Sequence, residues 1–254
     1  MTTLLPWPAL RGAMLCLALF AGLSTGLGAA RAAPLRPALH DDFDHYTFAL
    51  SWQPGWCGTS EGCAADQPKN VLIGIHGLWA SLPRSLSDRG IPRVQWWMHG
   101  CDFFQHSDAD PVLPVAVRRD LDAVLPHGKG SLLHHEYDKH VQCFGFDATT
   151  YFQTELAMRE KIVNSAFGHD LMQRAGTTVD HTVLFKSFAD TFRTTAPRAL
   201  QLQCHADAQG RILLTQFWIT IRHDAIDRFP APTSLTDAPV VQDNCPASFL
   251  IPGW

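Results

Sequence analysis

Seven cysteines and the N-terminal segment limit the possible structures of this chain more than any other sequence feature. Residues 1–32 contain no acidic residue, Ala13 to Leu27 form an apolar stretch, and Ala30-Arg31-Ala32 fits a small-residue cleavage pattern. The segment predicts a secretory signal peptide, because a membrane span needs roughly 20 apolar residues. An uncleaved membrane anchor remains the alternative, because Arg11 is the only basic residue before the apolar stretch.

The cysteine count then predicts disulfide bonds. Cys16 lies within the predicted signal peptide, so six cysteines remain for the mature chain. An even number in an exported protein predicts three disulfides formed in an oxidising compartment. Six free thiols in a cytosolic protein are the alternative, which the signal peptide disfavours. We therefore expect a secreted or periplasmic protein stapled through Cys57, Cys63, Cys101, Cys143, Cys204 and Cys245.

Length and charge limit the domain count and the function class. The chain has 254 residues, 46% of them hydrophobic, which fits one domain at 45–254 after a flexible lead-in at 33–44. The net charge of −4 becomes −6 when Arg11 and Arg31 leave with the signal peptide. This excludes a protein that coats nucleic acid through a general positive field. No second apolar span follows, so we expect no membrane contact in the mature form. We also expect a monomer without an obligate protein partner.

Hydrophobic periodicity predicts strands at both ends of the domain and helices between them. Strands are predicted at His45–Trp52, Val71–Trp79, Ala199–Cys204 and Ile212–Arg222. Helices are predicted at Val115–Leu125, Leu132–Cys143, Thr149–Phe167 with Asp147 as N-cap, and from a capping box at Thr177–Asp180 through Phe192. This order predicts an α+β fold, a single domain with a mainly antiparallel sheet and helices packed against it.

The second predicted strand and the connection after it carry polar or basic residues beside glycines and tryptophans. Strict alternation places His76 on the same face of the strand as Gly74 and Leu78, with open space beside the glycines. The connection at 80–112 then combines basic residues with tryptophans. It either rims a nucleic-acid cleft or is a solvated loop with two core tryptophans. Its residues in question are Arg84, Arg89, Arg93, Trp96 and Trp97.

The segment His135–Cys143 places four polar side chains on one helix face. At about 100° per residue, His135, Lys139, Glu136 and His140 fall at roughly 0°, 40°, 100° and 140°. Two imidazoles, a carboxylate and an ammonium on one arc are expensive to bury as packing alone. We therefore interpret this face as a reactive site, with Cys143 able to anchor the helix end through a disulfide.

Metal and serine-hydrolase chemistry fit these residues poorly. A zinc helix needs histidines at i and i+4, whereas His135 and His140 are five residues apart and Lys139 repels a cation. The chain has no G-x-S-x-G elbow. We expect no metal and no cofactor. A metal-binding protein that uses His134, His135 and His140 is the alternative.

The segments that begin at His76 and at His135 resemble the active-site motifs of the ribonuclease T2 family, the base-nonspecific acid endoribonucleases. The first family motif, His-Gly-Leu-Trp-Pro, is similar to His76–Ala80, and the second, His-Glu-Trp-x-Lys-His-Gly-x-Cys, is similar to His135–Cys143. Phe144-Gly145-Phe146-Asp147 resembles the bacterial periplasmic branch, and the opening Phe48–Pro54 is similar to the family pattern. Three residues depart from the pattern without removing a proton-transferring group: Ala80, Tyr137 and Val141.

The resemblance implies an endoribonuclease of low base specificity that cleaves single-stranded RNA. The ribose 2′-hydroxyl would attack, giving a 2′,3′-cyclic phosphate and then 3′-phosphate ends. Histidine suits both proton transfers because its usual pKa is near 6.5. The resemblance assigns His140 as base, His76 as acid, His135 to the phosphate, Lys139 to the developing charge and Glu136 to orienting the set.

The resemblance also implies a base contact and a disulfide pattern. Trp79 would stack on a base, an interaction worth about 1–3 kcal/mol. The implied pairs are Cys57–Cys63, Cys101–Cys143 and Cys204–Cys245. A catalytically silent secreted member of the same fold is the main alternative, although both histidines are present.

Overall fold

A six-stranded sheet forms the centre of the unit Ala33–Trp254 in the computed structural model, which describes residues 1–3, 35–60 and 62–254. The order is β2-β1-β5-β6-β3, and β4 pairs with β5. Only the β5–β6 pair is parallel, so the predicted α+β fold with a mainly antiparallel sheet is confirmed. The strands are β1 (His45–Trp52), β2 (Ile73–Ala80), β3 (Thr177–Asp180), β4 (Leu200–Ala206), β5 (Ile212–Arg222) and β6 (Ser248–Ile251).

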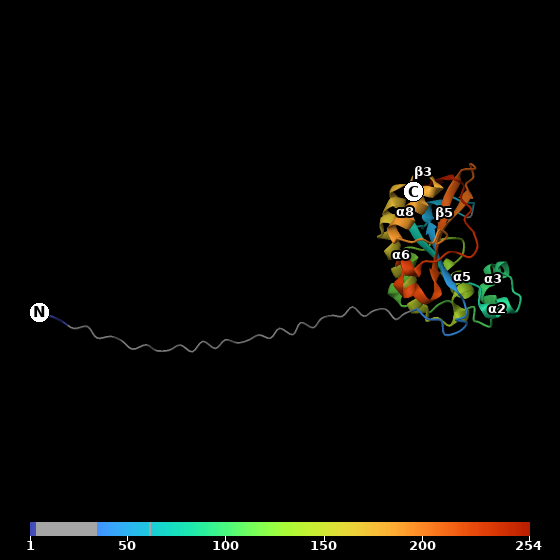
Figure 1. Ribbon diagram of the computed structural model, residues 1–254, viewed down its shortest axis with the longest axis horizontal. Helices are drawn as coiled ribbons and strands as arrows, with labels where there is room; N and C mark the ends of the chain where they lie inside the picture. The colour runs from blue at the N-terminus through green and yellow to red at the C-terminus, as the bar shows by residue number, and fades with distance from the viewer. Residues whose placement is uncertain (4–34, 61) are drawn as a thin grey trace. The chain divides into compact units, whose positions relative to one another are not determined.

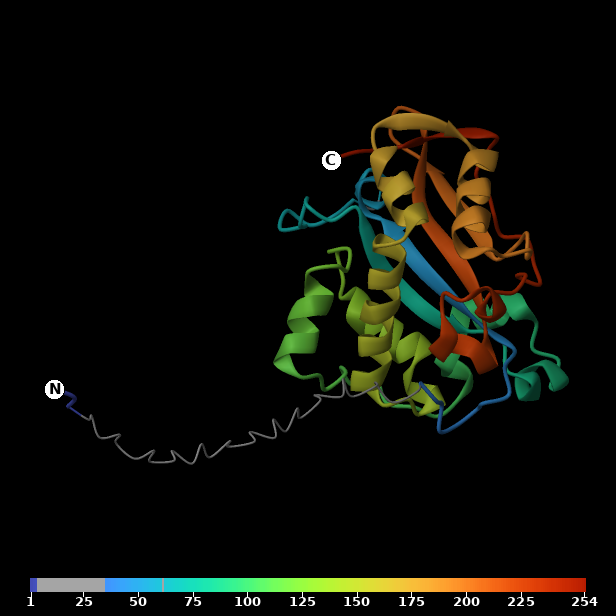
Figure 2. The same cartoon turned by 60° about the vertical axis from the view of Figure 1, so that its left-hand side comes forward.

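The helices are α1 (Gln53–Cys57), α2 (Arg84–Asp88), α3 (Arg93–His99), α4 (Val115–Asp122), α5 (Leu132–His140), α6 (Ala148–Val163), α7 (Ala166–Gln173) and α8 (His181–Phe192). Short 3-10 helices span Gly100–Phe103, Gln142–Phe144, His223–Arg228 and Pro232–Ser234. Figure 1 shows the sheet with α6 and α8 beside it, and Figure 2 shows α6, α7 and α8 together over one face of the sheet. No described helix has the length and apolar character that would let it cross a bilayer. The predicted signal peptide, with Cys16, lies almost wholly outside the described residues.

The core lies on both sides of β1, the strand between β2 and β5. From Phe48 to Trp52 every residue of β1 is buried, which explains why its hydrophobic run does not alternate. Burial of each large apolar side chain stabilises the fold by about 1.5–3 kcal/mol. The rigid centre of the sheet therefore supports β2, which carries His76.

All three implied disulfides are confirmed. Cys57–Cys63 closes a local loop after α1, and Cys101–Cys143 and Cys204–Cys245 close loops of sequence separation 42 and 41. In the chain-entropy account, longer closed loops restrict the unfolded chain more, so the latter two bonds contribute more stability. Cys101–Cys143 joins the segment after α3 to the segment after α5.

Two helix predictions need correction in their extent. The predicted helix Leu132–Cys143 ends at His140, and Cys143 lies in the 3-10 turn that follows. Asp147 is confirmed as an N-cap, because its side chain accepts from the Thr150 amide. The predicted helix Thr149–Phe167, however, is interrupted after Val163, where the Ser165 side chain caps the new helix α7.

The predicted capping box at Thr177–Asp180 is wrong. These residues form strand β3, paired with β6, and α8 begins after them without a side-chain cap. A tertiary partner from the C-terminus thus overrides the local helix signal. The connection at 80–112 is also more regular than predicted, since it contains α2, α3 and a 3-10 turn.

Candidate active site

A β-bulge in β2 sets the face of the strand on which the His76 side chain lies. Ala49 of β1 pairs with Gly77, and the next residue, Leu50, pairs with Ile75, so His76 has no partner across the strand pair. A bulge inserts one unpaired residue and interrupts the alternation of side chains, and such bulges often re-aim side chains beside functional sites. The strand therefore presents two consecutive positions to the same face.

The bulge brings His76 and Trp79 together. Their rings lie 5.4 Å apart and both side chains line one cavity of about 290 Å³. Strict alternation would have separated them. The prediction that Leu78 shares the face of His76 is therefore wrong, because Leu78 is buried in the core and does not border the cavity that His76 lines.

Glu136 of α5 links the two motifs. Its carboxyl group is buried; Trp79 Nε1 donates to Oε2 at 2.6 Å, and His76 Nε2 lies 3.4 Å from Oε1. This approach requires Gly77, because a Cβ atom there would lie 2.1 Å from Glu136 Oε2. The glycine after the histidine thus leaves room for the carboxylate that joins strand and helix.

The remaining polar residues of α5 face the same cavity. His135, Lys139 and His140 line it with Glu136, as the helical spacing predicted. The His140 ring lies 5.5 Å from Trp79 and 6.3 Å from His135. All of the predicted site residues, His76, Trp79, His135, Glu136, Lys139 and His140, therefore border one cavity.

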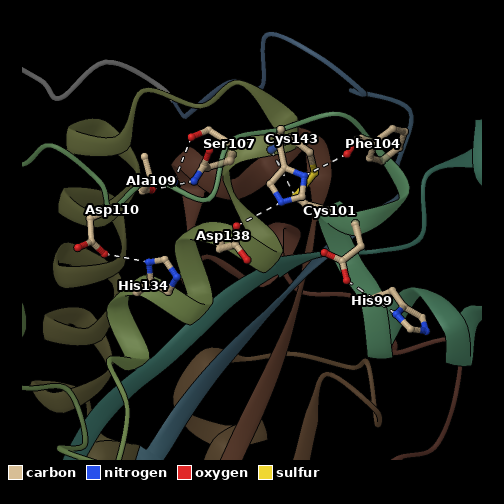
Figure 3. Close-up of polar contacts among 12 residues, drawn as sticks. His99, Cys101, Phe104, Ser107, Ala109, Asp110, His134, Asp138 and Cys143 are labelled. Carbon is tan, nitrogen blue, oxygen red and sulfur yellow. Dashed lines mark hydrogen bonds and ion pairs between the residues drawn. A yellow bond between two sulfur atoms is a disulfide. The ribbon is translucent and has the colours of Figure 1, made fainter.

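The outer side of α5 is fixed by the segment that follows α3 (Figure 3). His134 Nδ1 lies 2.9 Å from Asp110 Oδ1, and His106 Nε2 lies 3.2 Å from Asp138 Oδ1. The Gln142 side chain donates to the Ala109 carbonyl at 2.9 Å. These contacts, with the nearby Cys101–Cys143 bond, hold the helix so that its opposite face meets the cavity.

Burial lowers the pKa of both inner histidines. It lowers the pKa of His76 to about 4, with the charge of His135 adding to the effect. The pKa of His140 lies well below its usual value because of burial and then of Lys139. Burial raises the pKa of Glu136 to about 8, against the opposing Trp79 hydrogen bond. His135 also has a lowered pKa, from burial and Lys139.

His76 and Glu136 are best described as one titrating pair. The two side chains are in contact, so their protons come off in steps that belong to the pair. Between pH of about 4 and about 8 the pair holds one proton, which can reside on either partner. An anion in the cavity favours the arrangement with a protonated imidazole.

The site also contains a group of side chains with metal-ligand geometry. The ligand atoms of His135, Glu136 and His140 lie within 4.8 Å of one another. This group differs from the set suggested by the sequence, because His134 is bonded to Asp110 on the other side of α5. Lys139 lines the same cavity and repels a cation, and the Glu136 carboxyl already accepts from Trp79. The residues therefore fit an anion better than a metal ion.

Comparison with known proteins settles the family. The family model described as the Ribonuclease T2 family matches residues 43–229, which include both histidine motifs. The chain belongs to the ribonuclease T2 family. It is accordingly an RNA-binding endoribonuclease by family.

Relatives agree with this T2 assignment over most of the chain. Ribonuclease I of Escherichia coli is 29% identical over 87% of this chain and 91% of its own length. A probable ribonuclease of Haemophilus influenzae is 31% identical over 50% of this chain and 47% of its own length.

Solved structures agree in fold. Ribonuclease MC1 from bitter gourd seeds has a TM-score of 0.56 at 19% identity, covering 82% of this chain and 100% of its own. The Nicotiana alata self-incompatibility-associated SF11-RNase has a TM-score of 0.57 at 16% identity, covering 81% and 96%.

The three departures from the T2 motifs leave His76 and His140 in place, although one of them, Ala80, borders the same cavity. Ala80 is buried, and its carbonyl accepts from Trp96 Nε1. Tyr137 packs against Phe152, with 6.2 Å between the rings. Val141 is fully buried in the core. None of these side chains touches the ring of His76 or His140 as an aromatic partner or ion pair.

Sequence reasoning missed two tryptophans of this T2 site. Trp56 of α1 lies 5.0 Å from the His76 ring, and Trp218 of β5 lies 5.4 Å from the Trp79 ring. Trp218 could have been found, because it alternates with polar Gln216 and Thr220 on one face of β5. Trp56 gave no such signal, since it belongs to a short turn of helix beside Cys57.

Proposed function

We propose that this T2 endoribonuclease cleaves single-stranded RNA by attack of the ribose 2′-hydroxyl, with low base specificity. The products are 2′,3′-cyclic phosphates, which water then opens to 3′-phosphates. The observation that carries the proposal is the placement of His76 and His140, from a strand and a helix, on one cavity with Glu136 and Lys139. RNA supplies its own nucleophile, so the protein needs only to move protons and stabilise the phosphorane.

His140 is the general base. Its lowered pKa keeps the imidazole neutral at neutral and mildly acidic pH, so it can accept the proton of the 2′-hydroxyl. A base of such low pKa accepts protons weakly in the resting protein. The negative charge of bound phosphate raises its proton affinity as the reaction proceeds.

His76 is the general acid and gives its proton to the departing 5′-oxygen. Its proton comes from the pair with Glu136, which retains one proton up to pH of about 8. In the second step the two histidines exchange roles. Glu136 acts as a positioning residue, since it holds Trp79 and contacts His76.

His135 and Lys139 stabilise the phosphate. Both border the cavity, and Lys139 brings a permanent charge toward the phosphorane oxygens. Removal of one such donor in other enzymes costs about 100- to 1000-fold in rate. Because side chains neutralise the charge, we propose that the reaction needs no metal or other cofactor. Trp79 offers an aromatic surface to a base at the same cavity.

We further propose that the mature protein is secreted or periplasmic and acts as a monomer on RNA, without an obligate protein partner. Three disulfides require an oxidising compartment, and residues 1–32 have the character of a signal peptide.

A single blocked linkage tests the proposed nucleophile. We expect the protein to cut RNA at every linkage except one that carries a 2′-O-methyl group, and to leave DNA of the same sequence intact. The unmodified linkages of the same strand serve as the internal control. Cleavage at the methylated linkage at an equal rate would contradict the proposal, since no 2′-hydroxyl is available there.

A further inference from the structure

A second hollow shares part of its lining with the catalytic cavity. The hollow has a volume of about 390 Å³, and the cavity, at about 290 Å³, is at the small end of the range for ligand pockets. An RNA chain must therefore continue beyond the cavity. The residues that border both spaces are His45, Ser81, Leu82, Arg93 and Pro239.

Arg93 borders both spaces and brings a positive charge to them. It is the first residue of α3, it is exposed, and it forms no ion pair with any residue that the structure describes. Two other arginines of the hollow are paired, Arg84 with Asp44 at 3.1 Å and Arg222 with Asp224 at 3.0 Å. Among the described arginines of the hollow, Arg93 is therefore the one available to a phosphate that lies between the hollow and the cavity.

Trp97 lies one helical turn after Arg93, on the same face of α3. Its side chain is 40% exposed and borders the catalytic cavity. The preceding residue, Trp96, is 3% exposed and donates to the Ala80 carbonyl, so it fixes α3 directly after the motif of β2. Trp96 is therefore a core residue and Trp97 faces the cavity, whereas the sequence left the role of both open.

Trp79 is less available than Trp97 for stacking. Its indole nitrogen is bonded to Glu136, and its ring is surrounded by His76, His140 and Trp218 at 5.4–5.5 Å. Exposed aromatic rings beside a cation are the usual platform for single-stranded nucleic acid, because every base has a face that can stack.

We infer that Arg93 and Trp97 form a subsite for the nucleotide next to the cleaved linkage, in which Arg93 binds a phosphate and Trp97 stacks on the base. The inference rests on the proposed ribonuclease function but concerns binding, so it can be tested without turnover. The subsite is sequence-tolerant, in keeping with low base specificity.

The test measures the affinity of the full mature protein for a short 2′-O-methyl oligoribonucleotide, which cannot be cleaved. We expect Trp97→Ala to weaken binding about 10-fold and Trp97→Phe to restore most of it. Met98→Ala is the matched control, because Met98 is an exposed apolar residue of α3 that does not border the cavity. Equal losses in Trp97→Ala and Met98→Ala, or no loss in Trp97→Ala, would overturn the inference; equal losses would instead indicate a general apolar docking surface.

The phosphate contact has its own signature in the salt dependence. Each phosphate contact on a single strand contributes about 0.7 to the slope of log affinity against log salt. Arg93→Ala should reduce the slope by about that amount, whereas Arg89→Ala, an exposed arginine of the same segment outside both spaces, should not. An unchanged slope in Arg93→Ala would remove the phosphate contact from the inference.

A substrate comparison separates this inference from the proposed function. A nucleoside 2′,3′-cyclic phosphate has no neighbouring nucleotide, so Trp97→Ala should lose at least about 10-fold more kcat/KM on polymeric RNA than on this compound. A parent protein that binds the oligonucleotide through Trp97 but cleaves neither substrate would end the proposed function and leave the subsite standing. Equal losses on the two substrates would overturn the subsite.

Discussion

Replacement of Glu136 by Gln removes the buried acid that joins the two motifs without changing its size. The amide oxygen of the introduced side chain can still accept from Trp79 Nε1, so packing is retained. Burial raises the pKa of Glu136 to about 8, which means that the folded protein holds this proton more tightly than the unfolded chain. The ionised carboxylate therefore opposes folding at neutral and alkaline pH.

The size of the effect follows from linkage. Below pH 4.5 the carboxyl is protonated in both states and contributes no pH dependence; between 4.5 and about 8 the free energy of unfolding falls as pH rises. Each unit of pKa is worth about 1.4 kcal/mol, so the full difference is about 3–5 kcal/mol. For a domain of this size that corresponds to roughly 6–20 °C in Tm.

The assay measures the free energy of unfolding in urea for the parent and for Glu136→Gln from pH 4 to pH 9, and takes the difference between the two proteins at each pH. We expect the variant to be about as stable as the parent near pH 4 and more stable by about 3–5 kcal/mol at pH 9. The difference removes contributions that both proteins share, such as the His140 titration. A variant that is less stable than the parent at pH 8 would refute the reasoning, because Glu136 would then be ionised and stabilised by His76.

Three further predictions concern turnover. The rate against pH should be bell-shaped, with an acid limb below pH 6.5 set by His140 and an alkaline limb near pH 8 set by the His76–Glu136 pair. In Glu136→Gln the alkaline limb should move toward the pKa of His76 alone. An alkaline limb that stays near pH 8 in this variant would contradict the pairing. Lys139→Gln should lower kcat by about 100-fold or more with a smaller change in KM, and an effect confined to KM would show that Lys139 only binds substrate. Gly77→Ala should lower the free energy of unfolding by about 1–3 kcal/mol and remove most of the RNA cleavage, because the added Cβ would meet the Glu136 carboxylate. An active variant of parental stability would show that the close contact between Gly77 and Glu136 is not required.

Periodicity predicted the sheet well where neighbouring strands impose a simple pattern. β1 and β5 have the predicted bounds, because each is a continuous run of strand-forming residues that is buried over most of its length. β3 and β6 escaped prediction, since each is short and depends on the other to form. Their pairing joins residues far apart in the sequence, and no local signal reports it.

The candidate site could be predicted in its membership but not in its geometry. Helical spacing gathered His135, Glu136, Lys139 and His140, and the motif resemblance added His76. The bulge that aligns His76 with the helix depends on how β1 and β2 pair, which the sequence of one strand does not reveal. Trp56 and Trp218 likewise reach the site only through tertiary packing.

The most direct test of the account is the chemistry of the first product ends when purified protein cleaves single-stranded RNA in EDTA. The account predicts an unchanged rate, with 2′,3′-cyclic phosphate and 5′-hydroxyl ends first and 3′-phosphates later, because His76 and His140 move the protons and the ribose supplies the nucleophile. Early 5′-phosphate and 3′-hydroxyl ends, or loss of cleavage in EDTA, would contradict it, since both would mean that a metal-activated water attacks the phosphate.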